Sequence, residues 1–123
     1  PFRHGAMEGL REILEGFESG DTVRGAAIIG DDGLVIHASL FPGADSEAVA
    51  ALAITTMRHA EQFGGAGKCG PLRTAVFDFG DGPAILSALT ASATLVVLAR
   101  PDRDLGPLLY ELRTRRAALA GLV

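Results

Sequence analysis

The sequence predicts an α+β domain in which a five-stranded sheet is covered on both faces, with elements in the order α, β, β, α, β, β, β, α. Three observations predict this class. Two apolar runs flank an Asp-Asp-Gly turn at 31–33, an alanine-rich helical segment follows, and three closely spaced apolar runs precede a leucine-rich segment. Because the strands come in two groups instead of alternating singly with helices, we expect antiparallel pairing within each group.

The first expected element is an amphipathic helix near the N-terminus. Its apolar residues recur at helical spacing, with Glu and Arg on the opposing face; they are Met7, Leu10, Ile13, Leu14 and Phe17. The preceding PFRHGA has no helical or strand pattern. We therefore interpret residues 1–6 as a disordered or cloning-derived leader to a single domain at 7–123.

A β-hairpin is expected next. The run TVRGAAIIG at 22–30 is apolar on both sides, which is typical of a strand covered on both faces. The return strand is LVIHAS at 34–39. Gly33 suits the connecting turn, because short hairpin loops need the positive φ that glycine adopts without strain.

The central helix is predicted from about Asp45, whose carboxylate can cap the first turn, to Phe63, before Gly64 and Gly65. Ten consecutive residues within it, 48–57, carry no charge. One row of side chains at helical spacing consists of Val49, Leu52, Thr56, Ala60 and Phe63.

Two further apolar residues of this helix, Ile54 and Met57, point away from that row. One sheet covers only one side of a helix, so we expect a second copy of the chain or another protein to cover the other side. The alternative is a core helix enclosed within a monomer.

Three strands and a last helix complete the chain. The strands are LRTAVFDF at 72–79, AILSALT at 84–90 and ATLVVLA at 93–99, and the last is apolar enough to lie in the middle of the sheet. Asp104 is placed to cap the final helix. Its apolar face is formed mainly by Leu105, Leu108, Leu109, Leu112 and Leu119.

Composition limits the partners that we expect. The net charge is −4 and the Lys and Arg residues are scattered, except for Arg113, Arg115 and Arg116, so nucleic acid is not an expected partner. No apolar run approaches the ~20 residues that span a bilayer, so no membrane contact is expected either. A single cysteine, Cys69, fits a reducing cytoplasm.

No motif supports catalysis, a cofactor or a metal site. Gly67-Lys68 resembles the end of a phosphate-binding loop, but Gln62 and Cys69 stand where that motif needs Gly and Ser or Thr, and the expected helix precedes the loop instead of following it. His37 and His59 lie on different elements without a ligand-spaced Cys or carboxylate. We therefore expect a protein that is not an enzyme.

From Leu10 to about Leu119 the chain resembles the Roadblock/LC7 superfamily, and most closely its bacterial regulators of Ras-like GTPases of the MglB type. The resemblance rests on VRGAAIIGDDGLVIHAS, on the alanine-rich helix that starts at Asp45, and on LVVLARPDRDLGPLLYELR. It implies a three-layer α/β/α, profilin-like fold, with the central helix on one face of an antiparallel sheet and the terminal helices on the other.

The resemblance also implies a homodimer. Members of the family pair through the third strand, here LRTAVFDF, and their central helices meet. Arg73 and Asp78, near the two ends of this strand, are placed to meet across the junction. The residues expected at the dimer interface are Ala50, Ile54, Met57, Arg73, Ala75, Phe77 and Asp78.

The function implied by the resemblance is non-catalytic: a dimer that binds a small Ras-like GTPase of the MglA type and modulates its nucleotide cycle. The candidate partner-binding residues are Thr55, Arg58, His59 and Gln62. Two alternatives stay open. One is a small-molecule sensor of the profilin-like, GAF or PAS kind, with a cavity left by small residues such as Ala26 and Ala27; the other is a pure dimeric scaffold.

Overall fold

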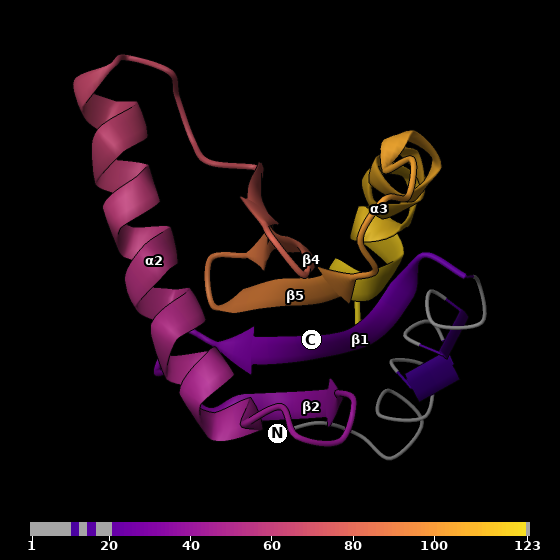
Figure 1. Ribbon diagram of the computed structural model, residues 1–123. Helices are drawn as coiled ribbons and strands as arrows, with labels where there is room; N and C mark the ends of the chain where they lie inside the picture. The colour runs from indigo at the N-terminus through magenta and orange to yellow at the C-terminus, as the bar shows by residue number, and fades with distance from the viewer. Residues whose placement is uncertain (1–10, 13–14, 17–20, 123) are drawn as a thin grey trace.

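The computed structural model describes residues 11–12, 15–16 and 21–122, and Figure 1 shows its elements. Residues 11–12 and 15–16 are helical, and the rest of the predicted first helix, like the predicted leader at 1–6, lies outside the described residues. The remaining elements are β1 (Val23–Gly30), β2 (Val35–Ser39), α2 (Ser46–Ala66), β3 (Thr74–Phe79), β4 (Gly82–Thr90), β5 (Ala93–Ala99) and α3 (Gly106–Ala120).

The five strands form one antiparallel sheet in the order β2-β1-β5-β4-β3. Helix α2 lies on one face and α3 on the other, so the predicted three-layer α+β architecture is confirmed (Figure 1). The most apolar strand, β5, lies at the centre as predicted, whereas β2 and β3 form the two edges. The order of strands follows from burial, because β1 and β5 have apolar residues on both sides and need a neighbour along each edge as well as a helix over each face.

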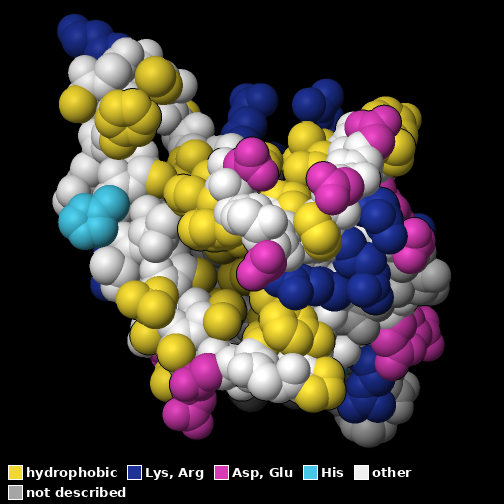
Figure 2. Space-filling model, viewed as in Figure 1, with side chains coloured by type: hydrophobic (Ala, Val, Ile, Leu, Met, Phe, Trp, Pro, Cys, Tyr) yellow, Lys and Arg dark blue, Asp and Glu magenta, His cyan; other side chains and the backbone are white. Residues whose placement is uncertain are grey.

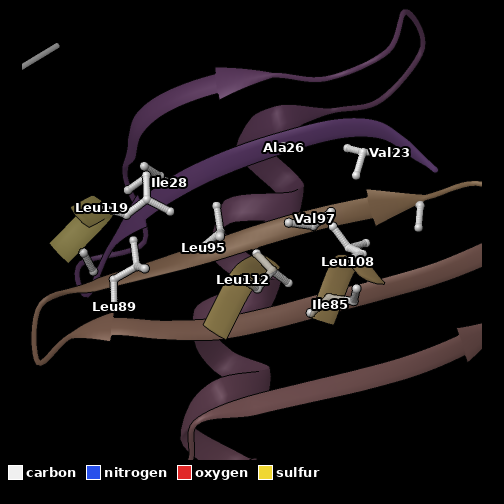
Figure 3. Packing of buried hydrophobic residues seen from close by; sticks show 12 residues of the cluster. Val23, Ala26, Ile28, Ile85, Leu89, Leu95, Val97, Leu108, Leu112 and Leu119 are labelled. Carbon is white, nitrogen blue, oxygen red and sulfur yellow. The ribbon is translucent and has the colours of Figure 1, made fainter. Parts of the chain in front are cut away.

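Among the described residues, buried hydrophobic side chains form two clusters, and the larger one lies beneath α3. Figure 3 shows this larger cluster. The side chains of Leu108, Leu112 and Leu119 of α3 pack in one cluster with Ile85 of β4 and Val97 of β5. Each of these five side chains is at most 6% exposed. The leucine spacing in the sequence therefore identified the sheet-facing side of this helix correctly.

The core beneath α2 corrects the sequence-based assignment of that helix. Ala50, Ile54 and Met57 are 0%, 6% and 4% exposed, because they pack on strands β1, β4 and β5 of their own chain. These side chains are therefore covered within their own chain, and they leave little surface for the dimer contact that the sequence predicted. Residues 50, 54 and 57 recur at helical spacing as the predicted row does, and periodicity alone does not show which of two apolar rows meets the sheet.

The end of α2 also differs from the prediction. The helix continues through Gly64 and Gly65 to Ala66, three residues beyond the expected end at Phe63. Glycine within a helix costs about 1 kcal/mol relative to alanine, which weakens the last turn without ending it. The chain turns at Lys68, whose φ is +56°, after the Gly67 amide has donated to the carbonyl of Phe63.

The helix starts agree with the expected capping chemistry. At α2 the Asp45 carboxylate accepts from the amide of Ala48 at 3.1 Å, as predicted. At α3 the N-cap position is occupied by Leu105, one residue later than expected, but the Asp104 carboxylate still accepts from the first helical amide, that of Gly106, at 2.9 Å. Both carboxylates therefore satisfy an amide that has no partner within its helix.

The backbone conformation at position 82, the first residue of β4, requires glycine. Its φ is +127°, and a Cβ at this position would collide with the carbonyl oxygen of Ala99 in β5. We expect Gly82→Ala to lower the free energy of unfolding by about 3 kcal/mol or more, since it adds backbone strain to a steric clash. Urea unfolding followed by circular dichroism measures the difference.

Gly80 provides the matched control in the same β3–β4 turn. A Cβ at Gly80 would have no heavy atom within 4 Å, and its φ is not in the left-handed region. Gly80→Ala should change stability by less than about 0.5 kcal/mol. Equal unfolding midpoints for the two variants would contradict the structural role of Gly82.

Candidate partner-binding surfaces

The outer face of α2 lies opposite the side packed on the sheet. We use this name for a strip at helical spacing that consists of Leu52, Thr55, Thr56, His59, Gln62 and Phe63. Leu52 is 65% exposed and Phe63 is 83% exposed. The row that the sequence suggested as apolar thus contains two of the large apolar side chains that the described part of the chain leaves exposed.

The four predicted partner-binding residues are all exposed and lie at helical spacing, so the structure brings them together. Two of them are engaged locally. The Thr55 hydroxyl donates to the carbonyl of Ala51 at 3.1 Å, and Arg58 Nη2 donates to the carbonyl of Asp31 at 2.8 Å. His59 and Gln62 make no side-chain hydrogen bond to any residue in the described part of the chain.

Arg58 ties the middle of α2 to the β1–β2 turn. Its hydrogen bond joins residues 27 positions apart in sequence and bridges the helix and the hairpin. Beside it lies a groove of about 840 Å³ lined by Asp32, Gly33, Leu34, Val35, Glu47, Ala51, Ile54, Thr55 and Arg58. The groove extends the candidate surface from α2 towards the hairpin.

Sequence reasoning missed the hairpin side of this groove. Leu34 is 67% exposed and Val35 is 37% exposed, so two adjacent aliphatic side chains begin the return strand in contact with solvent. The sequence contained a signal for this exposure. An apolar pair directly after an Asp-Asp-Gly turn lies at the tip of a hairpin, where the rest of the sheet does not cover it. Glu47 contributes the carboxylate on the α2 side.

The open edge of β3 is the second candidate surface. Strand β3 pairs only with β4, so its other edge has no neighbour among the described residues. Of the predicted interface residues here, Arg73 and Asp78 are exposed, whereas Ala75 and Phe77 are partly buried against the cluster beneath α2. Their placement at a sheet edge is as expected.

Two further apolar residues of β3 were not among the predicted set. Val76 is 45% exposed and Phe79 is 61% exposed, and the ring of Phe79 stacks on that of Phe77 with centroids 6.2 Å apart. Figure 2 shows hydrophobic side chains gathered between α2 and the rest of the molecule on this side. An open strand edge with exposed aromatic and β-branched side chains is a template for pairing with another strand.

The small residues considered for a sensor cavity are packed instead. Ala26 and Ala27 are 0% and 1% exposed and belong to the clusters beneath α3 and α2, respectively. Among the described residues, no group of three or more His, Cys, Asp or Glu is placed to hold a metal ion, and Cys69 is an exposed free thiol in the loop before β3.

An α/β/α domain with an open edge strand beside a long helix is thus the class that the fold defines. The sequence profile of the Roadblock/LC7 domain family matches residues 10–99, so the chain belongs to this family. No curated protein sequence matches the chain. Within the described residues, no helix combines the length and apolarity needed to cross a bilayer.

Several solved structures share the fold. The gliding protein MglB from Thermus thermophilus has a TM-score of 0.84 at 18% identity, covering 98% of this chain and 92% of that chain. An MglB structure described as having a tetrameric arrangement has a TM-score of 0.85 at 18% identity, covering 98% and 91%. The Roadblock/LC7 domain from Streptomyces avermitilis has a TM-score of 0.79 at 22% identity, covering 89% and 93%.

The division of α2 into a buried side and an outer face gives a direct test. We expect Ile54→Glu to destabilise the fold by about 3 to 5 kcal/mol, because it places an unpaired carboxylate beneath the helix. Leu52→Glu, a matched change on the outer face, should cost less than about 0.5 kcal/mol. Thermal unfolding by circular dichroism compares them, and a normal transition in Ile54→Glu would show that this side chain does not lie in the core.

Proposed function

We propose that this protein is a non-catalytic homodimeric regulator, or adaptor, that binds a small Ras-like GTPase in the cytoplasm and alters its nucleotide cycle. The observation that carries the proposal is a Roadblock/LC7 fold with an open, partly apolar β3 edge next to an exposed α2 face. In this proposal the β3 edge serves self-association, and the α2 face with its adjoining groove serves the GTPase.

The argument for self-association starts from the edge of β3. Open strand edges are usually protected by charge, proline, a bulge or a covering element. Of the six residues in β3, TAVFDF, only Asp78 is charged, and Val76 and Phe79 are exposed. Pairing with β3 of a second copy would satisfy the free backbone groups and place Arg73 near Asp78 of the partner. An MglB of the same fold is described with a tetrameric arrangement, which supports self-association.

A charge on the β3 edge should separate the two copies. We expect the wild-type protein to have about twice the 12.7 kDa chain mass in light scattering. Val76→Lys should shift the mass towards one chain while the protein stays folded, because two lysines would face each other across the two-fold junction.

The control is Leu34→Lys, an exposed aliphatic residue beside β2 at the opposite edge of the sheet. It should leave the mass unchanged. A monomeric wild-type protein, or a Val76→Lys variant that keeps the doubled mass, would exclude association through β3.

The surface proposed for the GTPase is the outer face of α2 together with the groove at the β1–β2 turn. The two are continuous, because Thr55 belongs to both. Exposed Leu34, Leu52 and Phe63 offer apolar anchors, and His59 and Gln62 offer hydrogen-bonding groups. A helix face with apolar anchors and a polar rim is a common form of recognition surface.

A regulator of this kind acts by differential binding. A Ras-like GTPase alters the arrangement of its switch loops with the bound nucleotide, and a partner shifts the balance between the arrangements only by the difference in its affinity for them. Arg58 is not proposed to enter the GTPase site, since its guanidinium is held by the Asp31 carbonyl. This protein would act by fitting one switch arrangement better than the other.

The test measures single-turnover GTP hydrolysis and nucleotide release by a Ras-like GTPase from the same organism, with and without this protein. We expect one of the two rates to change, and the change to be lost in Phe63→Glu or His59→Glu. Asp81→Lys, an exposed charge reversal in the β3–β4 turn, is the control. If the GTPase binds but neither rate changes, the protein is a scaffold, and regulation is excluded.

A further inference from the structure

A cavity between α3 and β3 is lined by a cluster of arginines. Its volume is about 590 Å³, and it is lined by Arg73, Thr74, Val76, Leu109, Arg113 and Arg116. Neither Asp nor Glu appears in this lining among the described residues. The net charge of the chain is −4, so it has more carboxylates than Lys and Arg side chains. Three arginines at one cavity without a carboxylate beside them are therefore unexpected in this chain.

Arg116 is held in the wall of the cavity by neutral groups. Its Nη2 donates to the hydroxyl of Thr74 at 2.7 Å, to the hydroxyl of Ser87 at 3.0 Å and to the carbonyl of Arg73 at 3.4 Å. Neither its buried Nε nor its Nη1 has a hydrogen bond to a described residue. A partly buried guanidinium is thus fixed in one orientation without a counter-charge from the described chain, although such charges are usually paired.

Arg113 lies one helical turn before Arg116 and lines the same cavity. It is exposed and makes no ion pair or side-chain hydrogen bond within the described part of the chain. Two other arginines are neutralised locally: Arg115 pairs with Glu111 at 3.1 Å and Arg103 pairs with Asp21 at 3.1 Å. The positive charges at the cavity therefore lack the carboxylate partners that these two arginines have.

We propose that this cavity binds a phosphate group. A phosphate monoester carries close to two negative charges at neutral pH, so it matches two guanidiniums, whereas a carboxylate supplies a single charge. Planar guanidiniums bind phosphate oxygens through paired hydrogen bonds. Val76 and Leu109 give the cavity an apolar wall that suits the organic part of a phosphate ester. All lining residues come from one chain, and the site does not depend on the proposed GTPase partner, although Arg73 and Val76 also lie at the β3 edge proposed for self-association.

Isothermal titration of the full chain with inorganic phosphate, at constant ionic strength, tests the proposal. We expect saturable binding that weakens about tenfold or more in Arg113→Gln, because one charge-assisted contact is lost. Arg113→Lys should retain part of the affinity. Arg115→Gln, which removes the same charge from a nearby position outside the cavity, should bind as the wild type does.

The source of the phosphate group is distinguished by a second arm. Flotation with phosphatidylcholine vesicles, with and without phosphatidic acid, shows whether a lipid headgroup reaches the site. Recruitment to phosphatidic acid vesicles that depends on Arg113 identifies a lipid as the source. Binding of inorganic phosphate without recruitment to vesicles identifies a soluble source. Absence of saturable binding in both arms, or equal weakening in Arg113→Gln and Arg115→Gln, would overturn the site.

A carboxylate from a second copy is the competing occupant. Asp78 is exposed on β3, close to the cavity along the same edge. If phosphate binds to Asp78→Asn but not to the wild-type protein, the arginines are neutralised by that carboxylate, and the phosphate site is overturned.

Discussion

The burial of β1 and β5 on both faces is the constraint on which the rest of the structure depends. Ile28 and Ile29 are adjacent, both are 0% exposed, and they belong to clusters on opposite faces of the sheet. One helix on each face is needed to exclude water from both side chains. Helix α2 therefore packs Ala50, Ile54 and Met57 on its own sheet, which leaves the outer face of α2 exposed.

The same constraint determines the chemistry of the sheet edges. Because the most apolar strands occupy the centre, β2 and β3 are left at the margins, and the apolar side chains of β3 are only partly covered. Alternation along β3 divides its side chains between two environments. Ala75 and Phe77 contact the cluster beneath α2, whereas Thr74 receives a hydrogen bond from Arg116 of α3. One edge strand thus borders both an apolar surface and a positively charged cavity. The protein recognition proposed for α2 and the anion recognition proposed beside α3 would use separate sides of the sheet.

The sequence by itself determined the element order from β1 onwards, the turn at Gly33, the central place of β5 and the leucine face of α3. These features depend on local chemistry: the alternation and apolar content of strands, the positive φ of glycine, and the 3.6-residue period of helices. It also indicated an exposed polar set on α2, because residues 55, 58, 59 and 62 lie at helical spacing.

Tertiary structure decided which apolar row of α2 meets the sheet, and with it which side chains remain exposed. Ile54 and Leu52 are two positions apart with similar hydrophobicity, yet they are 6% and 65% exposed. Only the position of α2 over the sheet separates them. The arginine cavity was likewise beyond local pattern, since it joins residues 73 and 74 to 113 and 116. Contacts between segments distant in sequence depend on how the layers pack, and no local period encodes that packing.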